Sequence, residues 1–269
     1  AAGRLLLGCL LATGLMGAVE SAVTPETTAP VEAVGRLLGE FAGDLHDPSE
    51  QAAMTRLITV FTERGTMNPD PKGAWVLLTF DRNTDLAAVE INAEHLLSAP
   101  SLIQHAVLVH ELEHLKRAKD TRRLVEAVSQ SGQAPEAAGP LHKIVRALVD
   151  DEYHAYRRAI LYVHGVVNAS GGLQAYLNTV PPGERLAIQQ YYQQSIGPFL
   201  TAAGDIHELR LRRDFVFFRT FPRRYRRYYE AALAWEALQG HVEIRRGHDG
   251  TLYPTHLLAP AAFLAWLLP

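Results

Sequence analysis

The chain has 269 residues, of which 48% are hydrophobic and 20% are charged, a composition typical of a globular protein with a buried core. Its net charge of −3 gives no general argument for a polyanionic partner. The single cysteine, Cys9, excludes an internal disulfide and any cysteine-based metal cluster. A metal site in this chain must therefore use His, Asp and Glu, and 12 histidines are present.

The first 24 residues have the pattern of a secretory signal, because Arg4 precedes an apolar run that ends in small residues. The alternatives are a signal anchor and an ordinary buried helix. Cys9 also resembles a lipoprotein cleavage site, but the apolar run continues past it. We therefore predict an exported protein, with a signal peptide or anchor at 1–24, a linker at 25–30 and a domain at 31–269.

Two helices are expected next. Apolar residues recur at helical spacing over 31–46. A second helix is expected from Pro48 to Arg64, because Asp47 can cap it and proline suits its first position. Glu50 would complete a capping box with Asp47.

The rest of the chain is mostly helical, with short β-rich runs. Runs at 74–80 and 86–92 predict a hairpin, and a last hairpin is expected within 241–258. Helical patterns cover 101–119, 121–129 and 141–163, with a loop at 129–140 and a helix end at Gly165. We expect a mainly helical α+β fold: a core at 74–165 with a small antiparallel sheet beside the helix at 101–119, and a helical extension at 166–269.

A metal-binding pattern lies within the helix at 101–119. His110 and His114 are four residues apart, so both imidazoles point the same way and can hold one ion. Glu111 lies about 100° around the helix from His110, where it can take a proton from a metal-bound water. This is the arrangement of the H-E-x-x-H motif.

Such a short motif can also arise by chance on a charged helix face. The aliphatic residues around it argue against that interpretation, since a solvated face would not carry so many: Val107, Leu108, Val109, Leu112 and Leu115. Two histidines leave the metal shell incomplete, so a third protein ligand is required. The candidate stretch is 150–159, in the next long helix.

Within that stretch, Glu152 has the helical phase of the buried residues Leu148 and Val149. Asp150 and Asp151 fit a solvated helix face equally well.

His110-Glu111-Leu112-Glu113-His114, followed on a second helix by Glu152-Tyr153-His154-Ala155-Tyr156, resembles the gluzincin metallopeptidases. The resemblance covers about residues 74–160. It implies a zincin-like core, Zn²⁺ as cofactor, Glu152 as third ligand and Glu111 as general base. An aspartate in many family members steadies a ligand histidine, and here Tyr156 takes that place. The family also has an edge strand that pairs with an extended peptide substrate, and 87–92 is placed to be that strand.

Other polar residues near the motif have structural interpretations beside functional ones. His105 is out of phase with the ligand pair and is expected to pack or lie at the surface. Glu113 is expected to be solvated or to support the ligands from outside. The resemblance implies that a His or Tyr beyond the third ligand polarises the substrate carbonyl, and four residues remain open for this role: Tyr153, His154, His164 and Tyr191.

The segment 210–230 carries eight arginines between Arg210 and Arg227, interleaved with Phe and Tyr. Such a segment could bind an anionic membrane surface or a cell-wall polymer. The alternative is a helical pair whose aromatic residues are core and whose guanidiniums pair with nearby acids, which the spacing of the aromatics favours.

The sequence therefore predicts an exported zinc metallopeptidase that acts on peptides or proteins. One alternative is a non-catalytic, metal-stabilised protein that binds an anionic surface through 210–230. Another is a metal-dependent cell-wall amidase. Nucleic acid is not expected as a partner.

Overall fold

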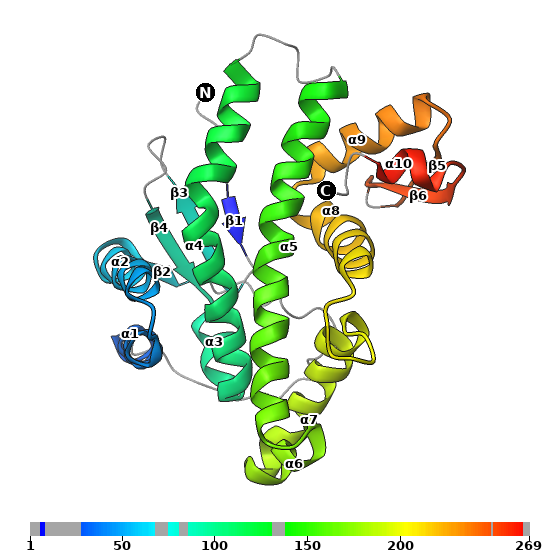
Figure 1. Ribbon diagram of the computed structural model, residues 1–269. Coiled ribbons are helices and arrows are strands. Elements are labelled where there is room, and N and C mark those ends of the chain that lie inside the picture. Colours follow the sequence, from blue (N-terminus) through cyan, green and yellow to red (C-terminus); the bar gives the residue numbers. More distant parts are fainter. Residues whose placement is uncertain are drawn as a thin grey trace. The chain divides into compact units, whose positions relative to one another are not determined.

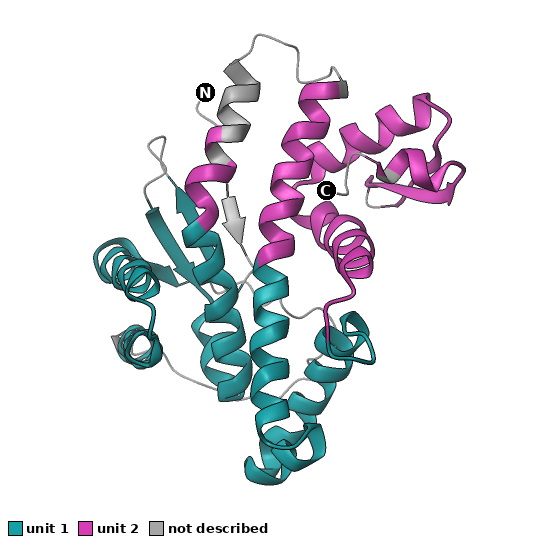
Figure 2. Cartoon of the chain, viewed as in Figure 1, with its two compact units in different colours: residues 1–116, 155–204 teal, residues 117–154, 205–269 magenta. Residues whose placement is uncertain are grey.

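The computed structural model describes residues 6–8, 28–67, 75–80, 86–130, 138–248 and 250–265. The chain forms two compact units (Figure 2): unit 1 comprises 1–116 and 155–204, and unit 2 comprises 117–154 and 205–269. The division falls inside α4 (Ser101–Gln130) and α5 (Ala138–Ala169), each of which is one continuous helix.

Unit 1 contains a sheet and most of the shorter helices (Figure 1). Besides its parts of α4 and α5, its elements in chain order are β1 (Leu6–Gly8), α1 (Thr28–Asp44), α2 (Pro48–Arg64), β2 (Thr66–Met67), β3 (Val76–Phe80), β4 (Leu86–Ile91), α3 (Ala93–Ser98), α6 (Leu173–Thr179), α7 (Pro182–Tyr191), the π-helical turn η1 (Tyr192–Ile196) and the 3₁₀ turn η2 (Gly197–Phe199). The predicted hairpin is confirmed, since β3 and β4 pair antiparallel.

The sheet of unit 1 has the strand order β1-β3-β4-β2. Its β3 alternates strictly, with Val76, Leu78 and Phe80 buried, as expected for a strand with one face on a core. The short β2 pairs in parallel with the end of β4, opposite Glu90 and Ile91. The expectation that this strand is an open edge was therefore wrong at its C-terminal end, because the chain leaving α2 extends straight into β2 and covers it.

The start of α2 follows the sequence signal in one respect and departs from it in another. Asp47 is the N-cap, and its side chain accepts a hydrogen bond from the backbone N–H of Ser49 at 2.8 Å. Glu50 was expected to close a capping box, but its carboxylate pairs with Lys116 at 3.2 Å and Arg158 at 2.5 Å. Two cations are stronger partners for this carboxylate than one backbone N–H.

The long helices extend further than their sequence patterns predicted. α4 continues to Gln130 and joins two stretches that were expected to be separate. α5 passes through Gly165, which is exposed and does not end it. The helix ends instead at Gly171 and Gly172, with φ of 87° and 105°, where the N–H of Gly172 donates to the carbonyl of Val167 at 3.0 Å. A positive φ at two successive positions suits glycine, so these two residues form the stop.

Within unit 1, side chains of α4 and α5 make contact with each other. The Tyr162 hydroxyl lies 3.2 Å from Nδ1 of His105, and the Arg158 guanidinium lies 3.1 Å from the carboxylate of Glu113. His105 also packs against Phe41, with ring centroids 5.5 Å apart. The prediction that His105 is a packing residue is therefore confirmed.

Unit 2 combines parts of α4 and α5 with the C-terminal elements of the chain: η3 (Arg210–Thr220, a π-helix), α8 (Phe221–Arg224), α9 (Arg226–Leu238), β5 (Val242–Arg246), β6 (Leu252–Leu257) and α10 (Pro260–Leu264). The last predicted hairpin is confirmed by the antiparallel β5–β6 pair. Aromatic rings contribute to the core of unit 2 around Phe217. The ring centroid of Phe217 lies 5.4 Å from that of Tyr229 and 6.0 Å from that of Phe263.

The chain is a mainly helical α+β protein, as the sequence predicted. Of the expected signal segment 1–24, only Leu6–Gly8 lies within the described residues, and it pairs antiparallel with β3. The remainder of that segment and the predicted linker 25–30 up to residue 27 lie outside them. Among the described helices, none is both long enough and apolar enough to cross a bilayer.

Candidate metal centre

The two histidines of the motif lie on α4 and are fully buried. His110, Glu111 and His114 each have 0% exposure, and so does Leu112 between them. The helix is therefore largely buried at this point, and the side chains of His110, Glu111 and His114 face the protein interior. The ring centroids of the two histidines lie 4.7 Å apart, and their Nε2 atoms lie 3.0 Å apart.

This separation of the two nitrogens has two chemical interpretations. A neutral imidazole N–H can donate to the unprotonated nitrogen of the other ring at this distance. Two nitrogens bound to one tetrahedral zinc at about 2.0–2.1 Å would lie about 3.3 Å apart, which is close to the observed spacing. In both interpretations the two Nε2 atoms lie close together, as two ligands of one ion must.

Glu152 on α5 supplies the third group. His110, His114 and Glu152 each offer one ligand atom, these atoms lie within 4.8 Å of one another, and all three side chains are buried. Two imidazoles and one carboxylate are the donor set of many catalytic zinc sites. These residues could hold a metal ion, and the residues predicted from the sequence as ligands are the ones brought together.

Tyr156, which was expected to support a ligand histidine, contacts His110. Their ring centroids lie 4.5 Å apart at an interplanar angle of 74°, and Tyr156 is 2% exposed. This is edge-to-face packing, which fixes the plane of the His110 ring. An aromatic ring at this position therefore orients the imidazole by contact.

Glu152 is part of an acidic run, Asp150-Asp151-Glu152, in which each residue pairs with a different arginine of unit 2. We call this run the acidic triplet. Asp150 pairs with Arg212 of η3, Asp151 lies 3.8 Å from Arg117 of α4, and Glu152 lies 2.5 Å from Arg224 of α8. Successive helix positions are about 100° apart, so three neighbours necessarily face three directions.

The sequence allowed Asp151 to lie on a solvated helix face. The structure excludes that position, because the side chain of Asp151 is 0% exposed. Asp150 is 31% exposed and is the most accessible of the acidic triplet. Thr121 also donates to Asp151, at 3.4 Å. A buried carboxylate is costly unless it is paired and hydrogen-bonded, and Asp151 meets both conditions.

Sequence reasoning missed two residues that contact Glu152. Besides Arg224, the Tyr225 hydroxyl lies 3.5 Å from Oε1 of Glu152, and both side chains are largely buried. Burial raises the pKa of the Tyr225 phenol well above its ordinary value. Its hydroxyl therefore keeps its proton and can act as a donor. The signal available in the sequence was complementary charge: an acidic run in one apolar helix and an arginine run in another segment.

The residues left open for carbonyl polarisation have other contacts. Tyr153 lies under the Arg212 guanidinium, 4.4 Å from its ring centroid. His164 is held by the Tyr192 hydroxyl and the Asn168 amide, each at 2.9 Å. His164 also lies twelve residues beyond Glu152 on α5, or about 18 Å along the helix at 1.5 Å per residue. At that distance His164 cannot polarise a substrate carbonyl held at the candidate metal centre.

The arginine segment divides into buried and exposed members. Arg212 and Arg224 have side chains only 7% exposed and pair with acids, while Phe217, Phe221 and Tyr229 are buried. This is the helical pair with internal ion pairs that the aromatic spacing favoured. Five other arginines of the segment are exposed and could still face an anionic surface, although Arg226 pairs with Glu230 at 3.0 Å: Arg210, Arg219, Arg223, Arg226 and Arg227.

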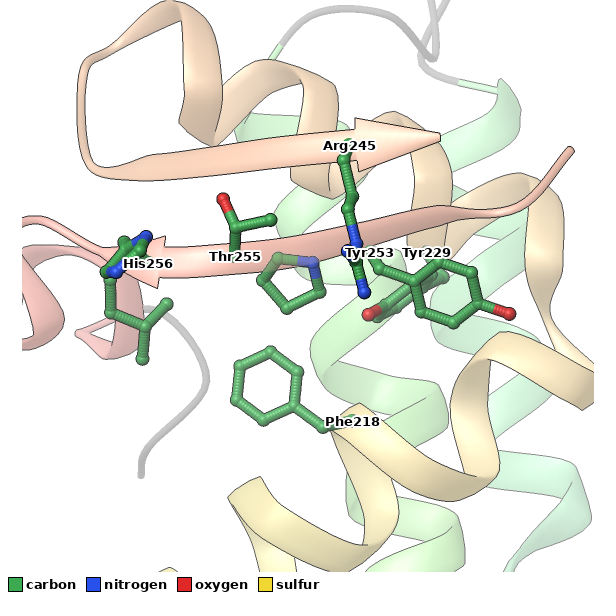
Figure 3. Close-up of a pocket in the computed structure, with 8 residues that line it drawn as sticks. Phe218, Tyr229, Arg245, Tyr253, Thr255 and His256 are labelled. Atoms are coloured by element: carbon green, nitrogen blue, oxygen red, sulfur yellow. The ribbon is translucent and has the colours of Figure 1, made fainter. Parts of the chain in front are cut away.

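A separate pocket of about 360 Å³ lies in unit 2, beside the β5–β6 hairpin (Figure 3). Its walls include rings of Phe218, Tyr229 and Tyr253, and Arg245 reaches across from β5. The lining of the pocket includes one histidine, His256, which pairs with Glu243 at 3.3 Å. None of the lining residues is acidic. The pocket therefore has no set of metal ligands of the kind found at His110, His114 and Glu152.

Comparison of the chain with models of known protein families, with characterised proteins and with solved structures gives no match. The function is therefore inferred from the chemistry of the residues themselves.

Proposed function

We propose that this chain is a zinc-dependent hydrolase and, more specifically, an exported metallopeptidase. The observation that carries the proposal is the buried group of His110, His114 and Glu152, with Glu111 directly after the first histidine. Two nitrogens and one carboxylate oxygen match the three-ligand sets of catalytic zinc sites, which keep a fourth position for water. A bound zinc would lower the pKa of that water and polarise a carbonyl.

The protein groups then have separate tasks. His110 and His114 bind through Nε2, and the Tyr156 ring holds His110 in its plane. Glu111 takes the proton of the attacking water and returns it to the leaving amine. A structural metal site needs no carboxylate beside its first ligand and fills its fourth position with a protein group. Glu111 therefore supports the catalytic interpretation over the structural one.

Two substrate classes fit this chemistry. Peptide cleavage is favoured by the resemblance of the two motifs to gluzincins, and hydrolysis of an amide in cell-wall material uses the same chemistry. A non-catalytic protein that binds an anionic surface is the alternative that the exposed arginines of 210–230 favour. Export follows only from the pattern of residues 1–24.

The decisive experiment compares the wild-type protein with Glu111→Gln and Glu113→Gln. Both changes remove one negative charge from the same helix, but Glu113 pairs with Arg158 and is part-exposed, while Glu111 is buried beside His110. Zinc content is measured by elemental analysis. Hydrolysis is measured by mass spectrometry on a mixture of unfolded proteins and, separately, on cell-wall peptide amides.

We expect both variants to hold one zinc per chain. Glu111→Gln should lower hydrolysis by about 10²- to 10⁴-fold, the range for loss of a general base, while Glu113→Gln stays within about threefold of wild type. Equal activity of Glu111→Gln and wild type would overturn the catalytic proposal. Stoichiometric zinc without hydrolysis of either substrate class would instead support the non-catalytic alternative.

A further inference from the structure

Arg224 lies directly against the carboxylate of Glu152 in the candidate metal centre. Its NH1 lies 2.5 Å from Oε1 of Glu152, and the two side chains are 7% and 0% exposed. The Tyr225 hydroxyl approaches the same oxygen at 3.5 Å. A full positive charge is therefore built into the protein directly against the one anionic ligand of the group.

The local fold explains how two neighbouring side chains reach one carboxylate. The helical path breaks at Tyr225, which has φ −123° and ψ 39°, between α8 and α9. The N–H of Tyr225 still bonds to the carbonyl of Phe221 at 2.8 Å, and the N–H of Tyr229 bonds to the carbonyl of Tyr225 at 3.0 Å. The break is thus held on both sides, and it places the guanidinium and the phenol on Oε1 of Glu152.

These contacts decide which oxygen of Glu152 can bind a metal. A carboxylate oxygen has two lone-pair sites. The guanidinium and the phenol both approach Oε1, at 2.5 Å and 3.5 Å, and so crowd the lone pairs of this oxygen. Ligation would therefore use Oε2 alone, and the carboxylate would be a one-oxygen ligand.

The charge of Arg224 also opposes a metal cation. Two like charges a few ångströms apart in a partly buried site repel strongly, because the local dielectric is far below that of water. A carboxylate already engaged by guanidinium is also a weaker donor to a metal, since contacts to a ligand tune its basicity. Both effects weaken metal binding relative to the same three ligands without the arginine.

We propose that Arg224 is a positioning residue that lowers the metal affinity of the group formed by His110, His114 and Glu152. Arg224 holds Oε1 of Glu152 and leaves Oε2 for the metal. Its charge also compensates that of the buried carboxylate, so a metal ion must compete with the guanidinium for Glu152. The inference rests on the metal-binding part of the proposed function and is independent of whether the protein cleaves peptides. It predicts a reversible site whose metal exchanges more readily than that of a site without the arginine.

The experiment measures the affinity of metal-stripped protein for Zn²⁺ alone, by competition with a chromogenic chelator. Arg224→Gln removes the charge but keeps a hydrogen-bond donor for Glu152, and Arg224→Lys keeps the charge but loses the planar fork. Arg223→Gln is the matched control, because Arg223 is the exposed neighbour on the same short helix. Circular dichroism reports the folding of each variant.

We expect Arg224→Gln to bind zinc at least about tenfold more tightly than wild type, since a nearby charge of the same sign is removed. Arg224→Lys and Arg223→Gln should stay within about threefold. General structural damage would loosen binding, so tightening separates the proposed role from a merely structural one. Unchanged or weaker binding by Arg224→Gln overturns the inference. If Arg224→Gln does not fold, Arg224→Lys decides: binding within threefold of wild type supports the charge role, and a tenfold loss overturns it.

A Glu152→Ala variant separates this inference from the proposed function. If wild type binds no zinc, or Glu152→Ala binds it as tightly as wild type, the ligand set itself is wrong. If Glu152→Ala loses zinc and Arg224→Gln binds like wild type, the ligand set stands and only the role of Arg224 fails.

Discussion

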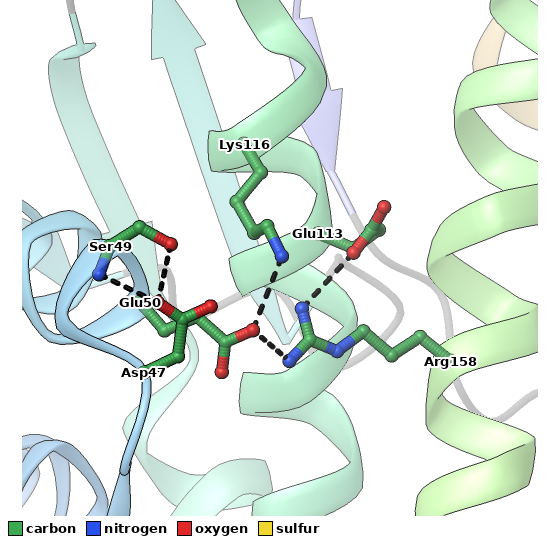
Figure 4. Close-up of polar contacts among 6 residues, drawn as sticks. All are labelled: Asp47, Ser49, Glu50, Glu113, Lys116 and Arg158. Carbon is green, nitrogen blue, oxygen red and sulfur yellow. Dashed lines mark hydrogen bonds and ion pairs between the residues drawn. The ribbon is translucent and has the colours of Figure 1, made fainter.

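Two groups of charged residues, each with members on α4 and α5, differ in their surroundings. In unit 1, Glu50, Glu113, Lys116 and Arg158 form a network whose side chains are 12–35% exposed (Figure 4). In unit 2, the pairs of Asp151 and Glu152 within the acidic triplet have carboxylates with 0% exposure. We call the first group the partly exposed network.

The two groups therefore differ in what their ion pairs cost and contribute to the free energy of unfolding. Partly exposed pairs are screened by water and contribute little each. Buried pairs are expensive to form and are strongly destabilised when one partner is lost. The buried pair of Glu152 and Arg224 therefore calls for an explanation beyond stability, and its position at the candidate metal centre provides one.

The largest effect is expected from breaking the buried pair. Glu152→Leu leaves the Arg224 guanidinium buried beside an apolar side chain, and we expect the free energy of unfolding of metal-stripped protein to fall by about 3–5 kcal/mol. The double variant Glu152→Leu/Arg224→Met removes both charges and should regain most of that loss. Urea unfolding followed by circular dichroism measures both. If Glu152→Leu lowers the free energy of unfolding by less than about 1 kcal/mol, the buried pair is no more costly to break than a pair in the partly exposed network.

A smaller effect is expected in the partly exposed network. The Arg158 guanidinium bridges Glu50 at 2.5 Å and Glu113 at 3.1 Å. A double-mutant cycle on Arg158 and Glu113 should give a coupling of about 0.2–1 kcal/mol, the range for exposed pairs. The same urea measurement applies. A coupling above about 2 kcal/mol would show that this network behaves as a buried one.

Salt should separate the two groups further. Raising the ionic strength from about 0.1 M to about 1 M shortens the Debye length from about 10 Å to about 3 Å. The coupling between Arg158 and Glu113 should then fall towards zero, while that between Arg224 and Glu152 should change little, because water and ions do not reach it. Repeating both cycles at the two salt concentrations is the test. Equal salt sensitivity of the two couplings would remove the distinction.

The smallest effect concerns His105, which lies on α4 as Glu113 and Lys116 do. Burial lowers the pKa of His105 in the folded protein, against an opposing effect of Asp44 and Glu40. The unfolded chain then binds the proton more readily, so this contribution to stability is complete above the unfolded pKa of about 6.5 and is lost as pH falls below it.

His105→Gln should therefore flatten the fall in unfolding free energy between about pH 7 and pH 5. The measurement is a urea unfolding series across that range for both proteins, with NMR titration of the His105 ring as a direct check. A variant profile steeper than that of wild type would mean that the pKa of His105 is raised.

Much of the fold followed from local patterns. The cap at Asp47, the β3–β4 hairpin and the last hairpin each lie where short-range signals put them. The errors concern places where a partner from elsewhere took over. Glu50 left its capping box for two cations, and β2 covered part of a strand expected to be an edge. Gly165 is not a stop, because α5 continues through it and the next turn buries Val167 as the turn before it buries Val163.

The sequence alone determined the chemistry available at the candidate metal centre. The spacing of His110 and His114, the apolar surroundings of the motif and the phase of Glu152 are all consequences of helical periodicity, which a sequence displays directly. Only the tertiary structure decided that Arg212, Arg117 and Arg224 pair with Asp150, Asp151 and Glu152. Periodicity fixes the direction in which a side chain points within its helix, whereas its partner is set by the packing of elements distant in sequence.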